Sequence, residues 1–153
     1  MLKIGPTKDA YAGIARTWDE KDRNGIAQIF ISHGDKIHSL QLQFVENGTL
    51  VLSKKHGSLG YTYAPNFSAV KLNYPSELIT GISGYSGIRE RDRVVTSIIF
   101  TTNKSTYGPF GCRAGDDTAF DYQIGGHNKF GGFHGTASNE IVSTQQSALR
   151  LSA

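Results

Sequence analysis

The chain is poor in cysteine, in methionine and in long hydrophobic runs. Cys112 and Met1 are the sole representatives of their residue types among 153 residues, so an internal disulfide is excluded. No window approaches the run of about 18 apolar residues that a membrane-spanning helix needs, and residues 1–6 lack the apolar core of a secretory signal. We therefore expect a cytoplasmic protein, with the nucleus as the alternative, and no membrane partner.

Signals for helices are equally scarce. Charged residues make up only 19% of the chain, which is low for a helical protein, and 18 glycines interrupt it. Each glycine costs a helix about 1 kcal/mol relative to alanine. The hydrophobic fraction of 38% is adequate for a core, and a chain of this length buries about two thirds of the surface that its unfolded form exposes. We predict one all-β domain over residues 1–153.

The net charge of +3 and the sequence pI near 9.0 do not come from a basic patch. Lysines and arginines are scattered, and the charge alternates in sign along residues 89–93 (Arg-Glu-Arg-Asp-Arg). Alternation of this kind is typical of a solvated loop and not of a phosphate-binding stripe. We expect no nucleic acid partner.

Two stretches carry the clearest strand signals. Residues 94–111 contain two β-rich runs around a polar corner, which predicts a β-hairpin. Residues 108–111 (Gly-Pro-Phe-Gly) predict the end of its second strand, because proline has no N–H to give to a sheet. The pair Asn47-Gly48 between apolar runs predicts another tight hairpin. Patterns of this kind predict about ten to twelve short strands.

An apolar strand, a glycine turn and a second apolar strand recur three times, at spacings of roughly fifty residues. The copies lie within residues 29–44, 81–101 and 131–144. A single sheet of this kind cannot bury its apolar face alone. The repeat predicts three similar sheets packed around one axis.

Residue patterns that carry catalysis or bind metals are missing. The five histidines, at positions 33, 38, 56, 127 and 134, form no metal-ligand spacing, and we expect them in turns and at the surface. Ser83, within Gly-Ile-Ser-Gly at residues 81–84, does not fit the Gly-x-Ser-x-Gly spacing of a nucleophile elbow. Asp116-Asp117 is interpreted as an acidic turn. Cys112 is either an ordinary loop cysteine or a somewhat reactive thiol. We predict no enzyme, no metal and no cofactor.

Four ordered motifs carry a resemblance to a known family. They are residues 5–6 (GP), 72–84 (LNYPSELITGISG), 102–111 (TNKSTYGPFG) and 132–135 (GFHG). Over roughly residues 2–141 the chain resembles the jacalin-related lectins of plants, and its motifs are closest to the antiviral type that restricts long-distance movement of potyviruses. The resemblance implies a β-prism of three four-stranded antiparallel Greek-key sheets with pseudo-threefold symmetry, and metal-free binding of mannose or galactose.

The resemblance also implies where a sugar would bind. Aromatic side chains can stack on sugar faces, although Trp18, Tyr61, Tyr63 and Tyr85 could equally bury their rings and hydrogen-bond through their polar atoms. The loop after the Phe-His-Gly motif would supply polar contacts. The candidate carbohydrate-binding residues are Gly5, Tyr85, Gly135, Thr136, Ser138, Asn139 and Glu140.

Two positions depart from the family pattern. The family has paired glycines soon after its first Gly-Pro, whereas residues 7–9 here are Thr-Lys-Asp. In an ungapped alignment the family's later glycine and sugar-binding aspartate fall on Ser138 and Val142. Loss of a charged acceptor lowers the free energy of sugar binding by about 1.5–3 kcal/mol. This is most of the roughly 4 kcal/mol that corresponds to a millimolar affinity. Glu140 could replace the aspartate only if the loop is rebuilt.

Two functions therefore stay open. One is a carbohydrate-binding lectin in plant defence, whose partner is a hexose or glycan end. The other is a protein-interaction module in antiviral defence that keeps the scaffold with a degenerate sugar site. Exposed sheet edges predict homo-oligomers. Residues 142–153 are mostly polar where the family ends on an apolar strand, so we expect a divergent, weakly ordered tail.

Overall fold

The computed structural model describes residues 15–20, 25–57, 66–89, 92–123, 133–138 and 149–152. Within these ranges the chain forms β-strands and no helix, so none of the described residues lies in a helix that could cross a membrane. The strands are β1 (Ala15–Asp19), β2 (Ile26–His33), β3 (Ile37–Glu46), β4 (Thr49–Leu52), β5 (His56–Gly57), β6 (Asn66–Lys71), β7 (Ile79–Arg89), β8 (Asp92–Thr102), β9 (Thr106–Gly111), β10 (Thr118–Gln123), β11 (His134–Ser138) and β12 (Leu149–Ser152).

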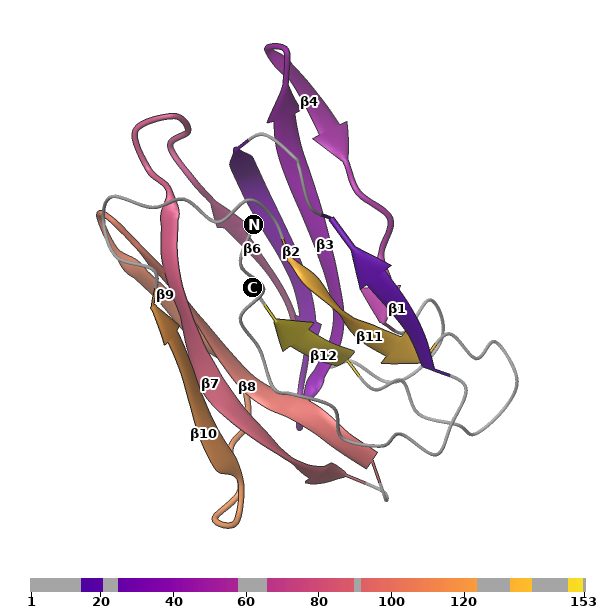
Figure 1. Cartoon of the computed structure of the whole chain (residues 1–153). Helices are drawn as coiled ribbons and strands as arrows, with labels where there is room; N and C mark the ends of the chain where they lie inside the picture. Colours follow the sequence, from indigo (N-terminus) through magenta and orange to yellow (C-terminus); the bar gives the residue numbers. More distant parts are fainter. Residues whose placement is uncertain are drawn as a thin grey trace.

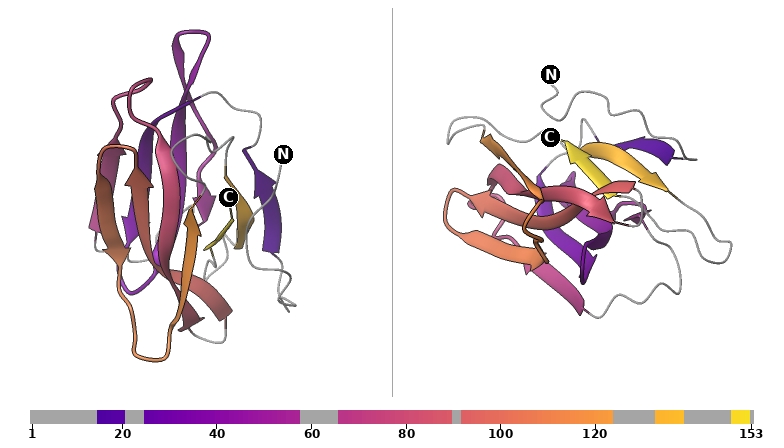
Figure 2. Two further views of the ribbon diagram at one scale, coloured as in Figure 1. Left: turned by 60° about the vertical axis from the view of Figure 1, so that its left-hand side comes forward. Right: turned by 90° about the horizontal axis from the view of Figure 1, so that it is seen from below.

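The strands assemble into three antiparallel sheets that surround one core (Figures 1 and 2). One sheet has the order β4-β3-β2-β6, with β5 also pairing β3, and a second has the order β10-β7-β8-β9. In both four-strand paths, the strand that comes last in the chain, β6 or β10, lies beside the strand that comes first, β2 or β7, which is the Greek-key arrangement. The third sheet has the order β1-β11-β12. The prediction of an all-β fold with three antiparallel sheets is confirmed, although the described sheets have five, four and three strands instead of four each.

Local turn chemistry sets the hairpins. Asn47 and Gly48 both have positive φ, at 50° and 77°, between β3 and β4. Two successive residues with positive φ match the right-handed twist of the flanking strands. The hairpin predicted from Asn47-Gly48 is therefore confirmed.

The hairpin predicted in residues 94–111 also forms, but its second strand does not stop where the sequence indicated. β9 continues through Pro109 to Gly111 and pairs with β8. The register moves from Phe100↔Tyr107 to Ile98↔Phe110, so one extra residue of β9 is accommodated in a bulge. β9 is the edge strand of its sheet, and an edge strand can hold a proline because the missing N–H faces away from the ladder.

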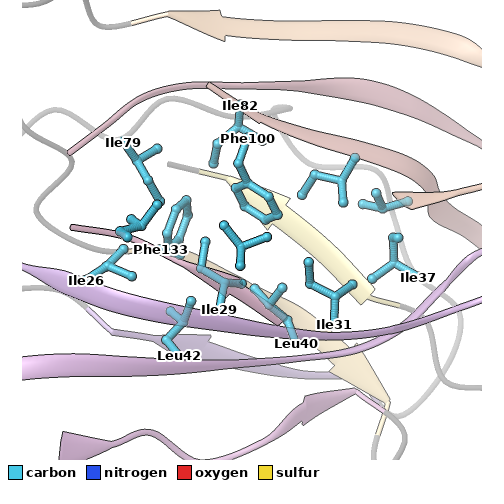
Figure 3. Close-up of a cluster of buried hydrophobic side chains, with 14 of the residues drawn as sticks. Ile26, Ile29, Ile31, Ile37, Leu40, Leu42, Ile79, Ile82, Phe100 and Phe133 are labelled. Carbon is cyan, nitrogen blue, oxygen red and sulfur yellow. The ribbon is translucent and has the colours of Figure 1, made fainter. Parts of the chain in front are cut away.

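The hydrophobic core lies between the sheets (Figure 3). Alternate residues of β2 and β3 point inward, as do those of β7 and β8, because side chains of a strand alternate between its two faces. Phe133, which precedes β11, packs edge-on against Phe100 with ring centroids 6.3 Å apart. Burying each such side chain contributes about 1.5–3 kcal/mol. The fully buried large side chains are Phe44, Phe100, Phe133, Ile29, Ile31, Ile37, Leu40, Leu42, Ile82, Ile98 and Val94.

In the second copy of the repeat, the glycines lie inside a strand and do not form the predicted turn, whereas Gly34 of the first copy lies in the β2–β3 connection. Gly84 lies within β7, opposite Ile98 of β8. A Cβ at Gly84 would lie 2.0 Å from the carbonyl oxygen of Ser97. The interpretation of this segment as a glycine turn is wrong, because the residue serves the contact between two paired strands.

Candidate functional site

Strand β11, which carries three of the residues predicted to bind sugar, ends at the same end of the molecule as the β7–β8 hairpin. The end of β11, the beginnings of β1 and β12 and the β7–β8 hairpin lie toward the lower right of Figure 1. β12 also contacts β8, so the small sheet adjoins the sheet that carries this hairpin. The β3–β4 hairpin lies at the opposite end (Figures 1 and 2). Strand ends from two sheets therefore lie at this end of the molecule.

Three of the candidate residues lie in β11, and Tyr85 lies in β7. Gly135, Thr136 and Ser138 belong to β11, which is the middle strand of its sheet. Gly135 and Thr136 pair with β1 on one side and β12 on the other, and Ser138 pairs with Ala15. Placing them in a loop was wrong, because a central strand commits its backbone groups to both neighbours. Gly5, Asn139, Glu140 and Val142 lie outside the described residues.

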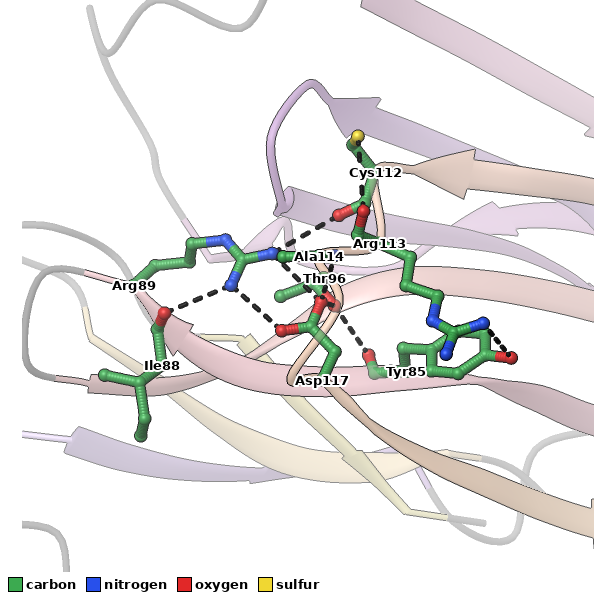
Figure 4. A network of polar contacts seen from close by, with 8 residues as sticks. All are labelled: Tyr85, Ile88, Arg89, Thr96, Cys112, Arg113, Ala114 and Asp117. Atoms are coloured by element: carbon green, nitrogen blue, oxygen red, sulfur yellow. Dashed lines mark hydrogen bonds and ion pairs between the residues drawn. The ribbon is translucent and has the colours of Figure 1, made fainter.

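A buried carboxylate organises the connections behind the β7–β8 hairpin (Figure 4). The side chain of Asp117 is 0% exposed and accepts hydrogen bonds from Arg89 Nη1 at 3.0 Å and Nη2 at 2.9 Å. Thr96 Oγ1 donates to it at 2.7 Å and the Ala114 N–H at 2.8 Å. The contact with Arg89, opposed by burial, holds the pKa of Asp117 well below its usual range. Asp117 is thus a structural anion and not a free acidic turn residue.

This ion pair corrects the interpretation of residues 89–93 as a solvated loop. Arg89 is the last residue of β7, and its side chain is only 18% exposed. The same group donates to the carbonyl oxygens of Ile88 at 3.1 Å and Cys112 at 3.4 Å. Arg89 therefore fastens the β9–β10 connection to the base of the β7–β8 hairpin.

Tyr85 already has a cation–π partner. The guanidinium carbon of Arg113 lies 4.3 Å from the centroid of the Tyr85 ring, and Arg113 Nη1 donates to the Tyr85 hydroxyl at 3.1 Å. A sugar that stacks on this face of the ring must displace Arg113 or bind beside it. Arginine offers several N–H donors, which suit hydroxyl oxygens. The half-buried Tyr85 and the exposed Arg113 thus form one polar and aromatic unit.

Trp18 also has a stacking partner. Its ring lies parallel to that of His56, at a centroid distance of 3.9 Å and an angle of 10°. His56 Nε2 and Glu20 Oε1 are 2.8 Å apart in a buried contact that joins β5 to the end of β1. Burial lowers the pKa of His56, although Glu20 opposes this shift. Tyr61 and Tyr63, predicted as alternatives, lie outside the described residues.

The histidines are less exposed than the sequence indicated. His38 and His56 are buried, and His33 and His38 lie in strands. Their prediction as turn and surface residues is wrong, because β2 and β3 bring the β2–β3 connection against the other sheets. Among the described parts of the chain, no group of three His, Cys, Asp or Glu side chains could hold a metal ion. Cys112 is exposed and forms no disulfide.

Two of the motifs that carried the family resemblance contact each other. Glu77 is buried and accepts hydrogen bonds from Tyr107 Oη at 2.8 Å, Thr102 Oγ1 at 2.9 Å and the Asn73 N–H at 3.1 Å. Asn103 Oδ1 accepts the N–H of the residue after Glu77 at 2.8 Å. These contacts join the β6–β7 connection to the β8–β9 turn, at the end of the β7–β8 pair opposite its hairpin. The two motifs thus maintain the fold, and sequence reasoning did not reveal their contact.

The family of this chain follows from comparison of its sequence with known proteins. A family model described as a jacalin-like lectin domain matches residues 10–144. The chain belongs to the jacalin-like lectin domain family. This jacalin-like lectin domain is 44% identical over 140 residues to the Arabidopsis thaliana protein RESTRICTED TEV MOVEMENT 1, covering 88% of this chain and 79% of that protein. Both the family resemblance and its nearness to an antiviral type are thereby confirmed.

Solved lectins share the fold of this jacalin-like domain. Frutalin from Artocarpus incisa in complex with galactose aligns with a TM-score of 0.71 at 28% identity, covering 90% of this chain and 99% of frutalin. A mannose-binding lectin from Champedak aligns with a TM-score of 0.72 at 26% identity, covering 99% and 91%. Carbohydrate binding is thus a property of the family, and the same fold serves lectins of both sugar types.

Proposed function

We propose that this chain is a non-enzymatic, carbohydrate-binding lectin that takes a mannose- or galactose-type glycan end and acts in plant defence in the cytoplasm or nucleus. The observation that carries the proposal is the fold shared with a lectin crystallised with galactose. The convergence of the β11 end and the β7–β8 hairpin at one end of the molecule supports it. Polar side chains of residues 138–140 (Ser-Asn-Glu) follow in sequence where β11 ends.

Retention on immobilised mannose and galactose tests this proposal. The chain should be retained on one of them and elute with the free sugar, while Asn139→Ala and Glu140→Ala should abolish retention. Asn47→Gly is a matched control, because it removes an exposed amide at the opposite end and glycine tolerates the positive φ of that position. Absence of retention on both sugars and on a glycan array, with a folded chain, would refute sugar binding.

A second candidate is a protein-interaction module in antiviral defence with a degenerate sugar site. The 44% identity to RESTRICTED TEV MOVEMENT 1 favours it, as do Ser138 and Val142 at positions where the family carries glycine and aspartate. Expression in susceptible plants should then restrict TEV spread. Restriction that survives Asn139→Ala and Glu140→Ala supports the protein-interaction function, whereas restriction lost together with sugar retention supports the lectin. Imaging a fluorescent fusion in the same plants tests the proposed cytoplasmic or nuclear location.

A further inference from the structure

Strand β6 is an open edge of the five-stranded sheet. It pairs with β2 on one side, and no other strand of the described ranges pairs with it on the other. Natural sheets protect their edges with prolines, bulges, charges or very short strands, as β9 does with Pro109 and its bulge. β6 has six residues, mostly exposed, a register without bulges and a lysine at its end. It is therefore a weakly protected edge.

The pairing with β2 shows which main-chain groups of β6 lie at the open edge. The N–H of Leu72, just after β6, donates to the carbonyl oxygen of Ala27 at 2.9 Å. In an antiparallel ladder, residue pairs that exchange hydrogen bonds alternate with pairs that do not. Continuing this alternation along the regular register leaves Phe67, Ala69 and Lys71 as the residues that do not bond to β2. Their N–H and carbonyl groups therefore point outward from the sheet, where a further strand could bind.

The same three residues turn their side chains to the outer face of the sheet. Val70 beside them is buried, and side chains alternate between the two faces of a strand. Phe67 is 68% exposed, and its ring stacks on that of Phe30 with centroids 6.2 Å apart. Lys71 is exposed at the other end of the strand. The edge thus presents an aromatic contact, a small residue and a cation, each two residues apart.

We propose that β6 binds an extended peptide segment of another protein, which adds to the sheet as an antiparallel strand. In this mode of recognition, main-chain hydrogen bonds give affinity and alternate side chains give specificity. The peptide residue opposite Phe67 is aromatic or β-branched, and the residue opposite Lys71 is acidic, because such cross-strand pairs are favourable. The strands run in opposite directions, so the recognised sequence is acidic-x-x-x-aromatic or acidic-x-x-x-β-branched.

Charge favours a foreign segment over a second copy of β6. The strand contains no acidic residue, so pairing with itself would leave Lys71 without a carboxylate. The inference goes beyond sugar binding and does not depend on it. It also gives the protein-interaction candidate a class of partner, namely a protein with an exposed or disordered segment of this pattern.

A labelled synthetic peptide and the full chain test the proposal. The peptide Thr-Glu-Thr-Val-Thr-Phe-Thr places its Glu, Val and Phe opposite Lys71, Ala69 and Phe67. Its fluorescence anisotropy should rise as the chain is added. N-methylation of the valine should abolish binding, because the N–H of that residue would face β6. N-methylation of the threonine after the valine is the matched control, since its N–H would point away from β6.

Substitutions in the chain test the two side-chain contacts. Phe67→Ser should weaken binding about tenfold or more, and Ile88→Ser is its control, because Ile88 is 54% exposed on a different sheet. Lys71→Glu should weaken binding several-fold, and a peptide with lysine in place of its glutamate should restore binding to this variant. Lys55→Glu is the charge control, since Lys55 is exposed in the β4–β5 connection.

Three results would overturn the inference. The first is no rise in anisotropy at the highest soluble concentration of folded chain. The second is equal binding of the two N-methylated peptides, which would exclude main-chain pairing. The third is self-association of the chain in sedimentation that is lost in Phe67→Ser, which would assign β6 to a second copy. Phe67→Ser should behave as the wild type on immobilised sugar, so failure of this inference and failure of sugar binding are distinct results.

Discussion

Arg89 and Asp117, which are 28 residues apart in the chain, form an ion pair in which two guanidinium nitrogens contact one fully buried carboxylate. Removing one partner of such a pair leaves the other charge buried without compensation. The contact joins the end of β7 to the β9–β10 connection. It therefore holds together two segments near the predicted sugar end.

Arg89→Ala should lower the free energy of unfolding by about 3–5 kcal/mol, because Asp117 stays buried after its partner is lost. Urea denaturation at pH 7 measures this value. Arg113→Ala is the control, since Arg113 is exposed and its contact with Tyr85 should contribute only about 0.5–1 kcal/mol. Equal effects of the two substitutions would show that the Arg89 contact is not a buried ion pair in solution.

Acid should destabilise the chain through its buried carboxylates. Hydrogen bonds lower the pKa of Asp117 and, against the larger opposing effect of burial, that of Glu77. A carboxyl group whose folded pKa is depressed contributes stability above its unfolded pKa of about 4 and loses it as pH falls toward the folded value. Urea denaturation between about pH 5 and about pH 2.5 should show this decline. The decline should be shallower in Arg89→Ala, and an unchanged slope would contradict the assignment.

Glu77 and Tyr107 should be energetically coupled. Tyr107→Phe removes a donor to a buried carboxylate and should cost about 1.5–3 kcal/mol, and Glu77→Gln should also destabilise. The double variant should lose less than the sum of the two by about 0.5–3 kcal/mol, because both substitutions remove the same contact. A double-mutant cycle by urea denaturation measures the difference. Strict additivity would show that the 2.8 Å contact carries no energy.

Histidines should also make stability depend on pH, in a pH range above that of the carboxylates. His33 Nδ1 accepts the N–H of Gly111 at 3.2 Å, so the neutral ring donates from Nε2 to Ser68 Oγ at 2.9 Å. Burial lowers the pKa of His33 from 6.5. As pH falls, His33 is therefore protonated in the unfolded chain before it is protonated in the folded chain. The free energy of unfolding should then fall as pH drops below about 6.5.

His33→Asn should reduce this slope between about pH 8 and about pH 5.5, because asparagine does not titrate and its oxygen can still accept a hydrogen bond. Urea denaturation at several pH values gives both slopes. The same slope in both proteins would show that His33 titrates alike in the folded and unfolded chains. His38 and His56, whose pKa values burial also lowers, should supply the remaining slope.

Gly111 should not tolerate a side chain. Its φ is +87°, and a Cβ would lie 2.1 Å from the carbonyl oxygen of Thr96. Gly111→Ala should cost at least about 2–3 kcal/mol through strain and overpacking. Gly115→Ala is the matched control, because nothing lies within 4 Å of a Cβ there. Thermal unfolding should separate the two variants, and similar melting temperatures would contradict the packing at Gly111.

Local signals in the sequence determined much of the fold. Asn47-Gly48 specified its hairpin because asparagine and glycine themselves favour the positive φ angles that this turn requires. The β-branched runs in β2, β3, β7 and β8 placed the core strands, since alternation along a strand depends only on neighbouring residues. Four motifs in order indicated the family, and with it three sheets and a carbohydrate-binding ancestry.

Tertiary structure alone decided the rest. The partners of Arg89 and Glu77 lie in other hairpins, so no local pattern revealed that Asp117 is buried or that Tyr107 contacts Glu77. Pro109 remains in a strand because β9 is at an edge, and the residues from Gly135 to Ser138 are paired because β11 is central. Burial and strand position depend on segments far apart in the chain, and packing of the sheets is what brings those segments together.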